Sequence, residues 1–166
     1  MNNEEAYKLV MQWPNFVGNF LNEADSAAVI LACSLFDDIL SRILIAFFVD
    51  CKISRELIYG GNAPLGTFSS RIKCTYSLGM LTKDELDDLN KLRKLRNEFA
   101  HKWNYLDLNN EKMISICRSM HHIRTDTPAN KQTARECFNT VVGVLFPALT
   151  LRATQAQHKE VHRQAP

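Results

Sequence analysis

The chain has 166 residues, the size of one ordinary domain. Hydrophobic residues make up 46% of it and charged residues 23%, which is the composition of a globular protein, and 6 Gly and 5 Pro are too few for a fold rich in strands and turns. Lys and Arg number 20 and Asp and Glu 18, so the net charge of +2 excludes a polybasic nucleic-acid-binding arm and an acidic tail. A local basic patch is still compatible with that charge.

Cysteine usage and the N-terminal residues indicate a reducing, cytoplasmic setting. The 5 Cys are scattered without a CxxC pair, and MNNEEAYKLV lacks the pattern of a signal peptide. We therefore expect most of the thiols to be small core residues. The longest apolar stretch, residues 27–49, contains Asp37, Asp38 and Arg42 near its centre. Because a bilayer disfavours such charges, this stretch predicts a buried helix and no membrane association.

Helical periodicity begins at the N-terminus. A first helix is predicted over residues 4–22, with Pro14 bending it. A second, over about 25–50, is apolar almost all round and should occupy the centre of the fold. A short helical turn over 54–59 then precedes the Gly- and Pro-containing break at residues 60–64.

Capping signals delimit the next two helices. A third helix over about 67–78 should end at Gly79, a typical C′ residue. Thr82 and Glu85 have the spacing of a capping box that opens a fourth helix, which runs to about His101. Its first turns are acidic and its last turns basic, an order that suits the helix dipole.

The remaining segments are also helical or irregular. A short helix is expected over about 111–121, a loop over 121–128, and a last helix from Thr133 into the 150s, with Pro147 as a candidate kink. No segment alternates in the manner of a strand, and no internal repeat is evident. We predict an all-α, single-domain bundle of about five to seven helices around the long apolar helix. We divide it into an N-terminal helix (1–26), a helical domain (27–153) and a polar tail that frays (154–166).

A cation is expected on the interior side of the fourth helix. Arg96 projects between Leu89 and Leu92 of the buried stripe, where it needs a carboxylate or a water-filled cleft. The candidate polar cluster consists of Asp38, Arg42, Arg71, Arg96 and His101. Two interpretations remain open: an ion-pair network that sets helix register, and a binding site in which His101 titrates near neutrality. Arg71 either joins this cluster or is surface charge.

The segment from Arg96 to His101 fits the pattern R-x4-H and resembles HEPN domains. These are all-α modules, and many are metal-independent ribonucleases that act as dimers. The resemblance implies that Arg96 binds the scissile phosphate, His101 acts as general acid or base, and Asn97 orients them. Arg96 and His101 lie about 140° apart around an ideal helix. They share one substrate only at a frayed end, in a bend or across a two-fold dimer.

A longer resemblance covers residues 27–150. In order and spacing, four segments resemble the mannitol operon repressor family: Pro64-Leu65-Gly66, Ser70-Arg71-Ile72-Lys73, Tyr76-Ser77-Leu78-Gly79 and Leu95-Arg96-Asn97-Glu98-Phe99-Ala100-His101. The resemblance implies an all-α bacterial transcriptional regulator that is dimeric and lacks an evident DNA-reading motif.

The residues agree with the lack of a DNA-reading motif. The helices over 67–78 and from Lys83 have the lengths of a helix-turn-helix, but the second would lead with Lys83-Asp-Glu-Leu-Asp-Asp. Four carboxylates there would be repelled by phosphate where base edges should be contacted. The basic stretch Lys91–Arg96, with Lys102, can contact a phosphate backbone, but Glu98 and the acidic first turns of the helix limit that contact. The alternative is a basic helix end that is only solvated surface.

Our leading hypothesis is a cytoplasmic repressor, a homodimer, that acts through a protein partner or an effector rather than by direct base reading. We expect no cofactor and no metal, because Cys117 and His121 have i,i+4 spacing without a second ligand pair. Under this hypothesis the protein is not an enzyme. The alternative is a HEPN-type ribonuclease or toxin-like nuclease using Arg96, Asn97 and His101. A third hypothesis is an interaction domain in which the cluster only sets packing.

Overall fold

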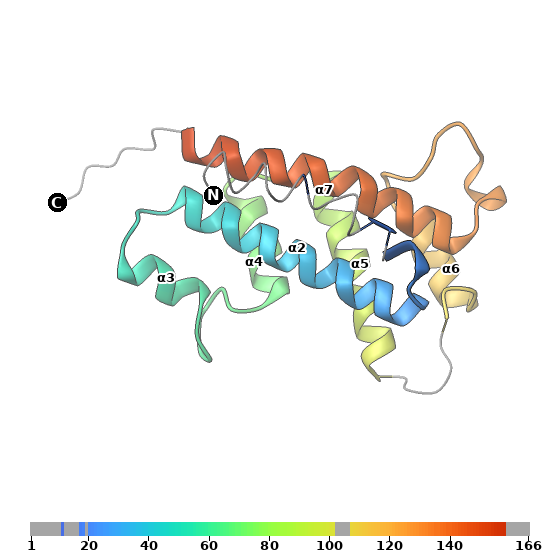
Figure 1. The fold of residues 1–166 in the computed structure, drawn as a ribbon, viewed down its shortest axis with the longest axis horizontal. Coiled ribbons are helices and arrows are strands. Elements are labelled where there is room, and N and C mark those ends of the chain that lie inside the picture. Colours follow the sequence, from blue (N-terminus) through green and yellow to red (C-terminus); the bar gives the residue numbers. More distant parts are fainter. Residues whose placement is uncertain (1–10, 12–16, 19, 102–106, 159–166) are drawn as a thin grey trace.

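The computed structural model describes residues 11, 17, 18, 20–101 and 107–158, and this part of the chain contains helices and no strand. The elements are α2 (Asp25–Phe47), α3 (Lys52–Ile58), α4 (Phe68–Ser77), α5 (Lys83–His101), α6 (Glu111–Arg118), the 3-10 helix η1 (Ala129–Lys131) and α7 (Ala134–His158). In Figure 1, α2 and α7 lie side by side along the long axis, and α5 crosses them steeply. The predicted all-α bundle is confirmed.

The core lies between the two longest helices and the helices that cross them. Helix α2 packs against α7, α4, α5 and α3, and α7 also packs against α6. Completely buried side chains come from α2 (Phe36, Ile39, Leu40, Ile43, Leu44), α5 (Leu89, Leu92, Leu95) and α7 (Phe138, Val141, Leu145, Leu149). Each such side chain contributes about 1.5–3 kcal/mol through burial. The central place predicted for the second helix and the predicted stripe of the fourth are therefore confirmed.

Helix α7 is long and apolar. Within the described residues, its segment Ala134–Ala156 is the one helix long and apolar enough to span a membrane, and 50% of the most apolar stretch of that segment is buried inside the protein. The core helix of a folded domain has the same length and composition. Helix α7 continues through Thr154 to His158, with Ala156 buried, so the start of the predicted tail is helical. Residues 159–166 lie outside the described part.

The predicted N-terminal helix falls largely outside the described residues, including its bend at Pro14. Residues 11, 17, 18 and 20–22 are helical. Phe20, at 2% exposure, packs its ring 5.6 Å from that of Phe138 on α7. The described end of this segment therefore joins the common core.

The turn after α4 is closed as the sequence predicts. Gly79 has a φ of +70°, the left-handed conformation that glycine adopts without a Cβ penalty. Its N–H donates to the Tyr76 carbonyl at 2.9 Å, and the Met80 N–H donates to the Thr75 carbonyl at 3.0 Å. These two bonds form a Schellman motif, which satisfies the last carbonyls of α4.

The predicted capping box at the start of α5 is also present. The Glu85 N–H donates to Thr82 Oγ1 at 3.2 Å, and the Thr82 N–H donates to Glu85 Oε2 at 2.7 Å. Arg152 of α7 donates from Nη1 to the same Glu85 oxygen at 2.6 Å. The cap therefore also fixes the start of α5 against the C-terminal half of α7.

A tight turn precedes α4 at residues 63–66. The Gly66 N–H donates to the Ala63 carbonyl at 2.9 Å, and the Leu65 N–H donates to the Leu57 carbonyl at 2.8 Å. A Cβ on Gly66 would lie 2.9 Å from the Ala63 carbonyl oxygen. A side chain at Gly66 would force this turn open, which accounts physically for a glycine after Pro64 and Leu65.

Arg71 of α4 ties this turn to α2. It is 8% exposed, and its Nη1 lies 2.8 Å from Asp37 Oδ1. Its Nε donates to the Leu65 carbonyl at 2.9 Å and its Nη2 to the Ile58 carbonyl at 3.0 Å. One guanidinium thus pairs with a partly buried carboxylate and donates to two carbonyls, and it holds the C-terminal end of α3 and the following turn against α2.

Replacing this guanidinium should be strongly destabilising. Arg71→Met should lower the free energy of unfolding by about 2–4 kcal/mol, because it leaves Asp37 without its ion-pair partner and the carbonyls of Ile58 and Leu65 without their donor. Urea denaturation followed by circular dichroism measures this. Arg42→Met is the matched control and should cost less than about 1 kcal/mol, because the Arg42 ion pair is exposed. Equal losses in the two variants would contradict a structural role for Arg71.

The carboxyl of Glu85 should make stability depend on acid pH. Burial raises its pKa, but hydrogen bonds from Arg152 and Thr82 outweigh burial and hold the pKa below its ordinary value of 4.5. Because the folded-state pKa is lowered, the ionised carboxylate stabilises the fold above pH 4.5, and this contribution is lost as the pH falls further. Glu85→Gln should therefore lower the melting temperature at neutral pH. As the pH falls into the acid range, the melting temperature of this variant should decrease less steeply than that of the parental protein.

Thermal unfolding over a pH series tests this expectation. Glu56→Gln removes an exposed carboxylate that pairs with Lys52 and should retain the parental pH profile. A Glu85→Gln profile parallel to the parental one down to the acid limit would show that Glu85 does not contribute.

Candidate interaction site on helix α5

Helix α5 carries four carboxylates in its first two turns, and the fold uses them in two ways. Glu85 and Asp88 are buried, whereas Asp84 is exposed and Asp87 partly exposed. The Lys83 Nζ donates to Asp87 Oδ1 at 2.7 Å, so the lysine at the start of the helix is paired within its own first turns. The outward side of this end of α5 is therefore acidic or neutralised.

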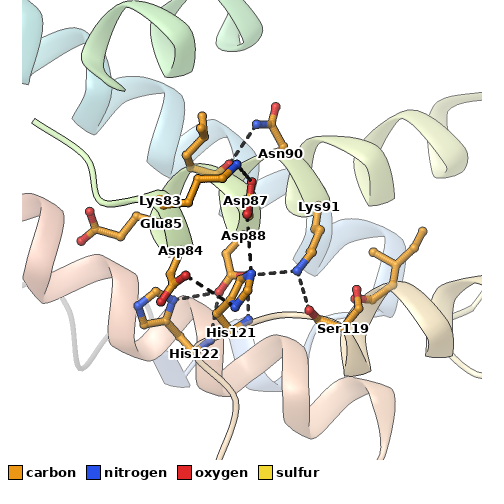
Figure 2. Close-up of polar contacts among 12 residues, drawn as sticks. Lys83, Asp84, Glu85, Asp87, Asp88, Asn90, Lys91, Ser119, His121 and His122 are labelled. Carbon is orange, nitrogen blue, oxygen red and sulfur yellow. Dashed lines mark hydrogen bonds and ion pairs between the residues drawn. The ribbon is translucent and has the colours of Figure 1, made fainter. Parts of the chain in front are cut away.

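Asp88 holds the chain after α6 against α5. Its side chain has 0% exposure, and its Oδ1 accepts the backbone N–H of His121 at 2.8 Å. Its Oδ2 accepts the backbone N–H of His122 at 3.0 Å and lies 2.8 Å from the His122 Nδ1, as Figure 2 shows. These contacts provide hydrogen-bond donors to a carboxylate that is shielded from solvent.

Lys91 and His121 complete this cluster around Asp88 (Figure 2). The Lys91 Nζ lies 3.6 Å from Asp88 Oδ1 and also donates to the Ser119 carbonyl. The His121 ring lies 3.6 Å from Asp84 and 3.7 Å from Asp87. The cluster therefore joins α5 to the end of α6 and surrounds its acidic groups with cationic or titratable partners.

The contact of Asp88 with the chain at His121 and His122 was not predicted from the sequence. Asp88 lies four residues before Leu92 and seven before Leu95, on the buried stripe of α5. A carboxylate at that position requires donors, and this was the available signal. The donors are backbone groups of a distant loop, which periodicity does not locate.

The structure distributes the predicted polar cluster over several separate contacts. Asp38 pairs with Arg42 at 2.7 Å on the exposed side of α2, whereas Arg71 pairs with the neighbouring Asp37. Among the described residues, no ion pair joins Asp38 to Arg96. Consecutive helix positions differ by about 100° in direction, so Asp37 faces α4 and Asp38 does not.

Arg96 finds an aromatic ring in place of a carboxylate. Its guanidinium lies 5.9 Å from the centroid of the Phe68 ring, at the start of α4, in a cation–π contact. Helix α5 continues to His101, which is exposed. On an ideal helix the side chains of Arg96 and His101 point about 140° apart. A continuous α5 therefore favours the two-fold dimer among the ways in which the nuclease hypothesis brings Arg96, Asn97 and His101 to one substrate, and that hypothesis stays a prediction.

The cysteines bear on the remaining metal and nucleophile hypotheses. Cys33, Cys117 and Cys137 are buried, as expected of core residues, and burial raises the pKa of Cys33 and Cys117 to about 12. Cys117 is buried while His121 extends toward Asp84 and Asp87. In the part of the chain that the structure describes, no three His, Cys, Asp or Glu side chains are grouped to hold a metal ion.

The second half of α5 presents a different surface, which we name the α5 basic face: Asn90, Lys91, Arg93, Lys94 and Asn97. Together with Asp87 these residues line a shallow, open depression. Glu98 turns away to Lys112 of α6, with 2.6 Å between Oε1 and Nζ. Positively charged and amide groups are therefore gathered on an open surface, which is suited to contact with a macromolecule. Lys102 of the predicted basic stretch lies outside the described residues.

Removing the charge of Asp88 should release the segment that follows α6. Asp88→Asn should lower the free energy of unfolding by about 2–4 kcal/mol. The two carboxylate oxygens of Asp88 accept the backbone N–H groups of His121 and His122, whereas an asparagine side chain has only one acceptor oxygen. Hydrogen exchange should show faster exchange at the amides of His121 and His122. Asp87→Asn, an adjacent and partly exposed change, should leave both amides protected. Unchanged protection in Asp88→Asn would contradict the anchoring role.

The chain is similar in sequence to mannitol operon repressors. The model of the family described as "Mannitol repressor" (MtlR) matches residues 17–155. The mannitol operon repressors of Escherichia coli K12 and of Escherichia coli O6:H1 are each 29% identical to it over 77 residues. That alignment covers 46% of this chain and 40% of each relative. The chain thus spans well under half the length of the curated relatives it matches.

A solved structure has the same fold. The X-ray structure of the MtlR–HPr complex from Escherichia coli matches with a TM-score of 0.58 at 20% identity. The match covers 86% of this chain and 99% of that one. The helical arrangement is therefore shared over most of both chains. Since the family model covers most of its length, this chain belongs to the mannitol repressor (MtlR) family.

Proposed function

We propose that this chain is a cytoplasmic transcriptional repressor that acts through a protein partner and does not read DNA bases itself. Three findings support this proposal. The family is that of the mannitol repressor, the curated relatives are named mannitol operon repressors, and the similar solved structure is a complex of MtlR with HPr. A protein of the HPr kind is accordingly the first partner to test.

The start of α5 is the observation that carries the proposal against base reading. Helices α4 and α5 and the turn at Gly79 have the order of a helix-turn-helix, in which the N-terminal residues of the second helix face base edges. Here Asp84 and Asp87 face outward, and Lys83 is paired with Asp87. Carboxylates in that position repel the phosphates that flank a major groove.

The same proposal includes a homodimer. Several large apolar side chains are exposed on the two longest helices: Ile30 (49%) and Leu31 (40%) of α2, and Val144 (42%) and Leu151 (59%) of α7. Apolar surface of this kind favours association, and most soluble oligomers are symmetric homo-oligomers. Analytical ultracentrifugation of Leu31→Glu beside the parental chain tests whether α2 forms that contact.

Deleting the gene in its own host and sequencing total RNA tests the regulatory proposal. We expect mannitol-utilisation transcripts to rise in the deletion strain and to fall again when the chain is restored. Fluorescence anisotropy with the corresponding promoter DNA should show weak, salt-sensitive binding that does not distinguish it from a scrambled duplex.

Two results would contradict the proposal. Unchanged transcripts in the deletion strain would remove the regulatory role. Tight binding by the isolated protein that distinguishes the promoter from scrambled DNA would show direct base reading.

Incubation of the protein with RNA in the absence of metal ions tests the nuclease hypothesis. Cleavage of the RNA that is lost in both Arg96→Ala and His101→Ala would establish that hypothesis.

A further inference from the structure

We propose that the α5 basic face is a docking surface for a short acidic segment of a protein partner, held mainly by Arg93 and Lys94. This inference rests on the proposed function only in taking the partner to be a protein. It assigns a place and a chemistry to that contact.

The charge balance of the face is the first argument. Lys91 forms an ion pair with Asp88 and a hydrogen bond to the Ser119 carbonyl. Asp87 forms an ion pair with Lys83. Arg93 and Lys94 form no ion pair with any residue in the described ranges. Two positive charges are therefore left without a counter-charge on an open surface, and carboxylates are the groups that complement them.

The Arg93 guanidinium is partly shielded from water by the protein itself. Its Nε is buried and, within the described part of the protein, has no hydrogen-bond partner. A cation that is partly removed from water without a counter-charge is costly. A carboxylate at this guanidinium therefore contributes more than one at a freely hydrated lysine, which makes Arg93 the expected centre of the contact.

The shape and amides of the depression favour a macromolecular surface. Asn90 donates its amide to the Leu86 carbonyl at 2.9 Å, which leaves its side-chain oxygen as an acceptor. Asn97 lines the same depression two turns further along α5. Small ligands bind in concave sites that enclose most of their surface, whereas this depression is open. Flanking amides beside a pair of cations suit the polar rim of a protein interface.

The extent of the face favours a short acidic segment over a nucleic-acid backbone. From Asn90 to Asn97 the helix rises by about 10 Å. On the N-terminal side of the face, Asp84 and Asp87 follow within two turns. A phosphate backbone running along α5 would meet those carboxylates, whereas a peptide with a few carboxylates fits between Asn90 and Asn97.

Fluorescence anisotropy with three labelled probes tests the proposal: a short glutamate-rich peptide, the same peptide with glutamine at each glutamate, and a short DNA duplex. We expect the glutamate peptide to bind more tightly than the glutamine peptide and the duplex. The double variant Arg93→Glu with Lys94→Glu should weaken that binding by about tenfold or more. Circular dichroism confirms that the variant is folded.

A second double variant shows whether weaker binding results from losing the α5 basic face or only from the change in the net charge of the protein. Lys73→Glu with Lys131→Glu makes the same change of charge at two exposed lysines of α4 and η1, and it should retain most of the binding. The proposal is overturned by three results: no binding of the glutamate peptide at low salt, equal weakening by both double variants, or tighter binding of the duplex that the α5 reversal removes.

The outcome is distinguishable from failure of the proposed function. Regulated transcripts together with no peptide binding would overturn the docking surface alone. Peptide binding that depends on Arg93 and Lys94, together with unregulated transcripts, would overturn the repressor proposal alone.

Discussion

Packing of α2 against α7 determines where the other helices can lie. Helix α2 is apolar on almost every side, so it is stable only when α7, α4, α5 and α3 cover it. Covering α2 on several sides also brings its polar residues close to other helices. Asp37 must then find a partner on α4, and Arg71 supplies it. The arrangement of helices thus follows from hydrophobic burial, and the polar contacts select among ways of achieving it.

Buried or partly buried polar groups connect elements that are distant in sequence. Arg71 joins α4 to α2, Glu85 joins α5 to Arg152 of α7, and Asp88 joins α5 to the segment after α6. Arg135 of α7 donates to Asp25 at 2.7 Å and to the Phe20 carbonyl at 2.9 Å. Such pairs add little net stability compared with apolar replacements. Each is costly to break on one side, however, and so each disfavours other registers of the helices.

The charge pattern of α5 links the fold to the proposed function. Its acidic first half serves the fold, through the cap at Glu85 and the anchor at Asp88, and its outward carboxylates are unsuited to DNA. Its second half contributes Leu92 and Leu95 to the core. Among the basic residues of that half, Lys91 and Arg96 contact other elements, whereas Arg93 and Lys94 form no ion pair within the described ranges. A helix dipole accounts for the order of acidic and basic residues along the sequence.

Local features of this protein follow from residues that are neighbours in the chain. The approximate positions of α2 to α7, the turn at Gly79, the capping box at Thr82 and the buried stripe of α5 were predicted correctly. The 3-10 helix η1 was not predicted, and most of the predicted first helix lies outside the described residues. The same T-x-x-E signal at Thr133 and Glu136 was overlooked, although both reciprocal bonds form there. Which polar groups meet depends on how the helices pack against one another. Asp37 rather than Asp38 faces Arg71, Arg96 meets Phe68, and Asp88 holds two backbone amides, because these partners depend on the rotation and distance of whole helices. Moving along a helix by one residue changes the direction of the side chain by about 100°. The periodicity of one helix shows which of its faces is buried, but it does not show how the neighbouring helices are rotated against that face.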